Sequence, residues 1–145
     1  MSRSNMLPML LAVALIAVTL SAHSAENTDG ATGLALHPGL KSPQKVDSPI
    51  CHSMSKMNLY YTGREAAMAE YLSWYKEKLS GFKFVSSVWS NRTHNAFYSQ
   101  DGTKLVSITG NPQGDGVYTV NYVVITPALK SSEIGKFSPS NPECK

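Results

Sequence analysis

The sequence segment that decides the fold is 60-YYTGREAAMAEYLSWYKEKLSGFKF-84. It reads as one amphipathic helix followed directly by a strand. Apolar residues recur every three or four positions, which places them on one face of a helix. These residues are Met68, Leu72, Tyr75 and Leu79. We expect this face to be buried, with Tyr71 and Trp74 beside it and available for another role.

The limits of this helix carry their own signals. Thr62 and Glu65 have the spacing of a capping box, in which each side chain accepts a hydrogen bond from the backbone of the other. Lys76 and Lys78 lie where a helix favours positive charge, in its last turn. Gly81 offers the left-handed residue that ends many helices. The helix is therefore predicted to begin at Thr62 and to end at Gly81.

Beyond Gly81 the apolar residues alternate, which is typical of strands. Strands are predicted at 82–90, 95–100, 104–109 and 117–126, and a short one at 56–61. They are separated by the turn-prone segment 91–94, by Asp101-Gly102 and by a Gly- and Pro-rich loop at 110–116. Because these connections are short, we expect sequential strands to be neighbours. The prediction is a two-layer α+β fold with one amphipathic helix on a four- or five-stranded antiparallel meander.

The first 25 residues have the features of an export signal. Arg3 precedes an apolar run over 6–20, and 21-SAHSA-25 supplies the small residues of a cleavage site. The run is shorter than the ~20 residues that a membrane-spanning helix needs. We therefore expect a signal peptide at 1–25, a periplasmic or secreted protein, and no stable membrane anchor after cleavage.

The exported chain is predicted to have a flexible leader at 26–50, rich in Gly, Pro, Ser and Asp, and a single α+β domain at 51–145. Cys51 and Cys144 are its two cysteines, and an even pair in an exported chain favours a disulfide. The bridge would close a loop of 93 positions. A reactive thiol at Cys51, beside His52, is the alternative, and an oxidising compartment argues against it.

Charge and motifs exclude several classes of function. The formal net charge is only +3, and the lysines are scattered, so no basic patch for nucleic acid is expected. No spacing of His, Cys or carboxylates matches a metal site, and no phosphate-binding or nucleophile motif is present. The sequence therefore predicts no cofactor, no metal and no nucleic-acid partner.

One catalytic reading remains open. His94 together with Lys83 or Asp101, or His94 paired with His52, would supply the acid and base of a small secreted ribonuclease-like hydrolase. The simpler interpretation makes His94 a solvated turn residue and His52 an exposed neighbour of the disulfide. We favour the simpler interpretation, so the protein is expected not to be an enzyme.

Aromatic residues provide the remaining functional signal. If one helix covers only one face of the sheet, some large side chains must lie on the surface, and aromatic residues with polar atoms are favoured at interfaces. The alternative is a second covering layer, such as the leader held down by Cys51, or ordinary scattered exposure. The candidate binding residues are Tyr71, Trp74, Trp89 and Tyr98. We expect them to contact a protein partner in the same compartment.

The segment from Tyr60 to Thr126 resembles a layout found in small exported bacterial proteins. In this layout a Y-x-G sequence precedes a helix, a glycine closes it and an antiparallel meander follows; here these are Tyr61 and Gly63, then Gly81, then the hairpin at Asp101-Gly102. Some proteins with this layout are similar to periplasmic inhibitors or immunity proteins. The resemblance implies an inhibitor- or immunity-like role toward an envelope enzyme or toxin. A small secreted hydrolase and an envelope assembly or structural factor are the alternatives.

Overall fold

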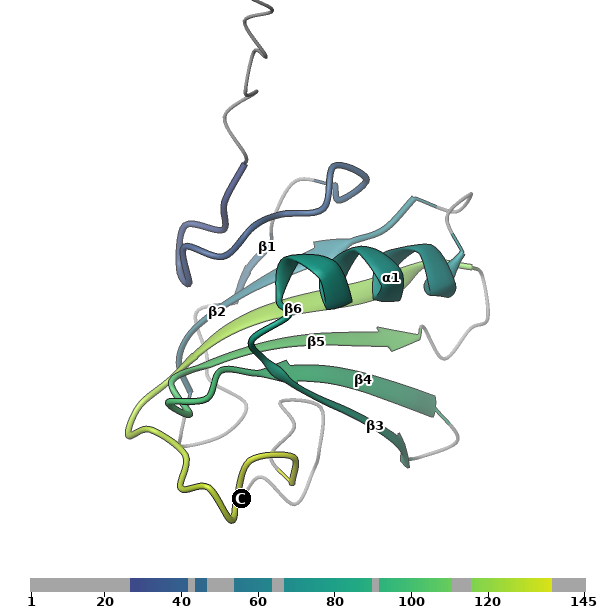
Figure 1. The fold of residues 1–145 in the computed structure, drawn as a ribbon. Helices are drawn as coiled ribbons and strands as arrows, with labels where there is room; N and C mark the ends of the chain where they lie inside the picture. Colours follow the sequence, from purple (N-terminus) through teal and green to yellow (C-terminus); the bar gives the residue numbers. More distant parts are fainter. Residues whose placement is uncertain are drawn as a thin grey trace, which may run out of the picture.

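In the part of the chain that the structure describes, the regular elements are one helix and a six-stranded antiparallel sheet (Figure 1). The computed structural model describes residues 27–41, 44–46, 54–63, 67–89, 92–110 and 116–136. The elements in chain order are β1 Gln44–Val46, β2 Met54–Tyr61, α1 Met68–Lys78, β3 Lys83–Trp89, β4 Arg92–Tyr98, β5 Lys104–Gly110 and β6 Tyr118–Ile125. Five strands have seven or eight residues and β1 has three, so the predicted α+β class is confirmed.

The strand order is β1-β2-β6-β5-β4-β3, with every neighbouring pair antiparallel. Strands β3 to β6 form the predicted meander. Strand β2, however, pairs with β6 rather than with the strand that follows it. The chain between β2 and β3 passes through α1, which carries it across the sheet from one side to the other (Figure 1). The expectation that all sequential strands would be neighbours was therefore wrong at this crossover.

The helix is shorter than predicted at both ends. Its N-cap residue is Ala67, which provides no side-chain hydrogen bond, and its C-cap is Leu79. The helix does not begin at Thr62, whose hydroxyl accepts a hydrogen bond from the backbone N–H of Tyr118 at 2.9 Å; Glu65, the other residue of the predicted capping box, lies outside the described residues. Gly81 is not among the glycines with positive φ. Thr62 thus joins the sheet to the segment before the helix.

The buried face of α1 is rotated toward Tyr71 relative to the prediction. Tyr71 and Tyr75 are completely buried and Leu79 nearly so, whereas Met68 and Leu72 are only partly buried. These helix residues pack against one cluster of the sheet, which consists of Phe97, Val106, Ile108, Val120 and Tyr122. Each large side chain removed from water in this way contributes roughly 1.5–3 kcal/mol to stability.

The face of the sheet opposite α1 also carries a buried core, in agreement with the alternative of a second covering layer. Its buried apolar residues are Met57, Ala96, Tyr98, Leu105, Val123 and Ile125. The segment after β6 folds back over them, and its Leu129 and Ile134 pack against this second core. The turn at Gly102 anchors the segment, because the Leu129 N–H donates to the Gly102 carbonyl at 2.9 Å. A second covering layer therefore exists over part of this face.

The predicted flexible leader is also corrected, because residues 27–41 belong to the fold. Leu34, Leu36 and Leu40 pack against the helix-side core, and Figure 1 shows this segment beside α1 and β2. Asp29 is 1% exposed and fixes the turn at its start. The two cysteines of the predicted disulfide, Cys51 and Cys144, both lie outside the described residues.

Asp29 holds this segment through both carboxylate oxygens. One oxygen accepts from the backbone N–H groups of Ala31 and Thr32 and from the Thr32 hydroxyl, at 2.7–3.1 Å. The other accepts from the Asn58 amide at 2.7 Å and the Tyr60 hydroxyl at 2.6 Å, both on β2. A buried carboxylate needs such partners to offset its loss of hydration, so the network ties the segment to the sheet.

A tyrosine relay makes a second tie. Tyr122 donates its hydroxyl proton to the Ala35 carbonyl at 2.7 Å. Since that proton is then in use, Tyr75 must be the donor in the 2.6 Å contact between the Tyr75 and Tyr122 hydroxyls. Burial raises the pKa of both phenols above the ordinary value, which keeps both protons in place.

Candidate functional site

Two of the four predicted binding residues are buried. Tyr71 lies under the His37 ring, with ring centroids 4.2 Å apart. Tyr98 belongs to the second core, and burial raises its pKa to about 12. Both side chains therefore support the fold rather than present a ring to a partner.

The other two candidates lie in different places. Trp74 is partly buried on α1. Its ring centroid lies 5.0 Å from that of His37 and 4.8 Å from that of Tyr75. Trp89 is the last residue of β3; its side chain is outside the description. The four predicted residues therefore do not form one surface, and Trp89 alone lies on a sheet edge.

The structure separates His94 from Lys83 and Asp101, two of the three neighbours considered in the catalytic alternative. His94 is not a turn residue but lies within β4, 4% exposed, with its Nδ1 3.3 Å from the Thr109 hydroxyl. It stands opposite Ser87, whereas Lys83 stands opposite Tyr98, four residues further along β4. That spacing corresponds to about 13 Å. Asp101 lies beyond Tyr98, in the following turn, and His52 is outside the described residues.

Within the described parts of the chain, no group of three or more His, Cys, Asp or Glu residues is placed to hold a metal ion. A search of the same residues finds no helix with the length and apolar character needed to cross a membrane.

Strand β3 forms one edge of the sheet and is the first candidate surface. It pairs with β4 in one continuous register from Lys83 to Trp89, and no other described residue pairs with its outer side. An edge strand directs the backbone N–H and C=O groups of alternate residues away from the sheet. Along its seven residues, β3 thus presents a row of backbone groups that no described strand pairs with.

Most of β3 lacks the sequence and structural features that usually prevent an edge strand from pairing with another chain. Natural edges are blunted by charged residues, proline, bulges or short length. Strand β3 has no proline and no bulge, and its one charged residue is Lys83, at its first position. Ser86 and Ser87 are exposed, and Val88 is 76% exposed. The other edge differs, because β2 is flanked there by the three-residue β1 and the Lys41 N–H donates to the Tyr61 carbonyl at 2.8 Å.

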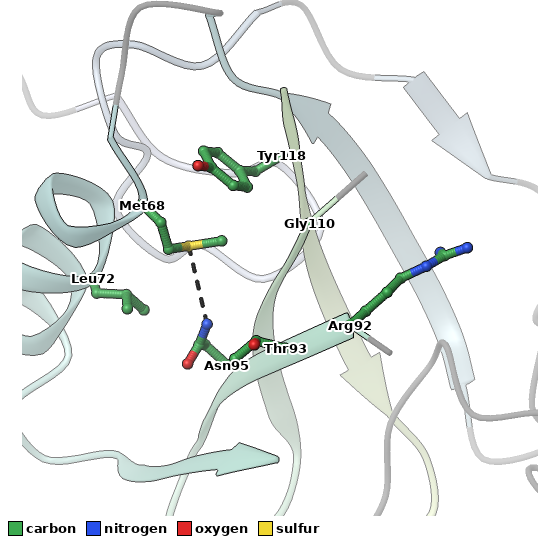
Figure 2. A pocket seen from close by; sticks show the side chains of 7 residues that line it. All are labelled: Met68, Leu72, Arg92, Thr93, Asn95, Gly110 and Tyr118. Atoms are coloured by element: carbon green, nitrogen blue, oxygen red, sulfur yellow. Dashed lines mark hydrogen bonds between the residues drawn. The ribbon is translucent and has the colours of Figure 1, made fainter. Parts of the chain in front are cut away.

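The second candidate surface is a groove of about 400 Å³ between the N-terminal part of α1 and the sheet (Figure 2). Its lining comes from four elements: Met68 and Leu72 of α1, Arg92, Thr93 and Asn95 of β4, Gly110 of β5, and Tyr118 of β6. Figure 2 shows Asn95 pointing toward Met68, whereas the Arg92 side chain extends away from both. The inner wall of the groove is therefore mainly apolar, with the Asn95 amide as a polar group.

Sequence reasoning missed the residues that define these two surfaces: Val88, Asn95, Gly110 and Tyr118. The alternation over 82–90 predicts that Val88 lies on one of the two faces of its strand. It does not predict which of these faces is exposed. The groove could not be found from sequence, because its residues are brought together by the sheet order. The turn at Asp29 did have a signal, since Asp followed by Gly, and by Thr three positions later, is typical of turns that an aspartate caps.

Comparisons with known proteins identify no relative: no family model matches this chain, and neither the curated proteins nor the solved structures give a significant match.

Proposed function

We propose that this protein is an exported, non-enzymatic binding protein that recognises an extended segment of a protein partner at the edge of β3. The observation that carries the proposal is the unprotected edge, seven residues long and with Val88 76% exposed. Addition of a partner strand to an open sheet edge is a common mode of peptide recognition. Backbone hydrogen bonds would supply affinity, and side-chain contacts specificity.

The side chains along β3 agree with a mainly apolar partner segment. Phe84, Ser86 and Val88 lie on the helix side of the sheet, while Lys83, Val85 and Ser87 lie on the other. Phe84 and Val85 are partly exposed, so an added strand could cover apolar surface on both faces. We infer that the partner contributes an alternating segment with β-branched or aromatic residues, which pair well across strands.

An inhibitor- or immunity-like role is the concrete form of this proposal. A protein that pairs with an extended segment of an envelope enzyme or toxin would hold that segment in one conformation and block its access to other molecules. The export signal expected at 1–25 supports this location. The alternative of a hydrolase that uses His94 gains no support from the described residues, because Lys83 and Asp101 lie toward the other end of the sheet.

The test is affinity capture from the envelope fraction with the exported protein and two variants. Val88→Lys places a charge on the edge, and because Val88 is largely exposed the folded domain should tolerate it. Ser73→Lys, on the exposed side of α1, is the matched control for added charge. We expect one partner to be retained by the unmodified protein and by Ser73→Lys, and at least tenfold less of it by Val88→Lys. Equal retention by all three would refute a role for the β3 edge.

A further inference from the structure

We propose that the groove between α1 and the strand ends binds an apolar group that carries an uncharged hydrogen-bond acceptor, such as a carbonyl. This inference goes beyond the β3 proposal, because it depends on Met68, Asn95, Gly110 and Tyr118 and on none of the β3 backbone. The argument rests on the space in the groove, on the hydrogen bonds of Asn95 and on the distribution of charge.

The space is created by Gly110 at the end of β5. A Cβ atom added at Gly110 would meet no atom of the described residues within 4 Å, so none of their side chains fills the position above it. Met68 and Leu72 close the helix side, and Tyr118 closes the β6 side (Figure 2). A volume of about 400 Å³ lies within the range of small-molecule sites, so the groove can hold an apolar group with an attached amide or ester.

The polar requirement comes from Asn95, which is 3% exposed. Its side-chain oxygen accepts from the Ser86 hydroxyl at 2.9 Å, and its amide nitrogen faces the Met68 sulfur at 4.0 Å. A thioether sulfur can accept a hydrogen bond but cannot donate one. The amide group is therefore oriented with its nitrogen, which is the donor, toward the Met68 sulfur. Two N–H donors therefore share one weak, distant acceptor among the described residues. A buried donor without a good partner is costly, and a ligand oxygen in the groove would satisfy it.

The charges near the groove indicate that this acceptor is neutral. Among the described residues of the lining, Arg92 is the only charged one, and Figure 2 shows its side chain directed away from Met68 and Asn95. A carboxylate inside the groove would lose hydration without gaining a cation from the described lining as partner, which is unfavourable. A neutral carbonyl group loses less hydration free energy and still accepts a hydrogen bond from the Asn95 amide. The acceptor could belong to a free small molecule or to the backbone beside an apolar side chain of a peptide.

The experiment is a titration of the uniformly ¹⁵N-labelled exported protein, followed by NMR of the Asn95 side-chain amide and the Met68 methyl group. Hexanamide is the probe for a free ligand, N-acetyl-leucinamide is the probe for a peptide, and acetamide is the control with an acceptor but no apolar body. We expect saturable shifts at Asn95 and Met68 with at least one of the first two, and none with acetamide. Tighter binding of hexanamide would indicate a free ligand, and tighter binding of N-acetyl-leucinamide a peptide.

Three variants test the location. Gly110→Leu should fill the groove and weaken the bound probe at least tenfold, and Gly110→Ala should weaken it by a smaller factor while disturbing the sheet less. Val88→Lys should leave probe affinity unchanged, so failure of the β3 proposal and failure of this one can be told apart. Absence of saturable shifts with both probes, or unchanged affinity in folded Gly110→Leu and Gly110→Ala, would overturn the inference.

Discussion

Replacement of Asp29 by alanine tests whether residues 27–41 are a structural part of the domain. The carboxylate accepts five hydrogen bonds, and two of the donors, the Tyr60 hydroxyl and the Asn58 amide, belong to the sheet. Tyr60 is itself buried, so in the variant its hydroxyl would lose its partner inside the protein. Leaving one buried polar group unsatisfied costs about 1–3 kcal/mol.

The total cost is smaller than the sum of five bonds. Bonds that share one carboxylate are not additive, and the substitution also removes the cost of burying that carboxylate. We therefore expect Asp29→Ala to lower the free energy of unfolding by about 3–5 kcal/mol. For a domain of this size, that change corresponds to a fall in Tm of about 10–20 °C.

Two assays measure this effect. Urea denaturation gives the change in the free energy of unfolding, and limited trypsin digestion reports on the segment itself, because Lys41 is its one tryptic site. We expect faster cleavage after Lys41 in Asp29→Ala. Asp29→Asn, which keeps the size and one acceptor oxygen, should lose about 1–3 kcal/mol. A loss below about 1 kcal/mol in Asp29→Ala, with cleavage as in the unmodified protein, would refute the view that this network holds the segment.

Three further predictions concern other contacts. Gly102→Ala should cost about 2–4 kcal/mol in urea denaturation, because Gly102 has φ +69° and an added Cβ would collide with the Leu129 carbonyl; Gly81→Ala, with open space around it, is the control and should cost far less. Tyr122→Phe should cost about 1–3 kcal/mol, since it removes the acceptor of the Tyr75 hydroxyl proton and the side-chain donor to the Ala35 carbonyl; a change below about 0.5 kcal/mol would contradict the relay. Burial lowers the pKa of His37 from its ordinary value of 6.5, against a smaller opposing effect of Glu70, so the unfolded chain takes up a proton more readily. The stability that depends on neutral His37 is complete above pH 6.5 and falls as the pH drops below it. The urea midpoint of the unmodified protein should therefore be lower at pH 5.5 than at pH 7.5, and this difference should be smaller in His37→Phe. An unchanged difference would contradict the assignment.

The local periodicity of the sequence was sufficient to predict the helix, the five longer strands and the hairpin at Asp101-Gly102. It was not sufficient to fix which side of the helix is buried. Tyr71 and Tyr75 are both amphipathic, and the phase of the helix is set by partners such as the Tyr122 hydroxyl and the His37 ring, which come from distant parts of the chain.

The errors in the remaining elements have related causes. The leader has no helical or strand periodicity, yet a single buried aspartate and three leucines are enough to fix it to the sheet. The start of β4 was placed too late because the polar residues Arg92, Thr93 and His94 look like a turn. Sheet order placed β3 at an edge and β2 beside β6, and that order depends on the crossover of α1 rather than on any local pattern.

The central claim, that β3 receives a partner strand, is tested most directly by amide hydrogen exchange of the protein alone and with the captured partner. We predict that alternate backbone amides of β3 exchange rapidly in the free protein and become protected in the complex, with little change on the exposed side of α1. Protection confined to α1 or to residues 27–41, with β3 amides exchanging at the same rate in both states, would contradict it.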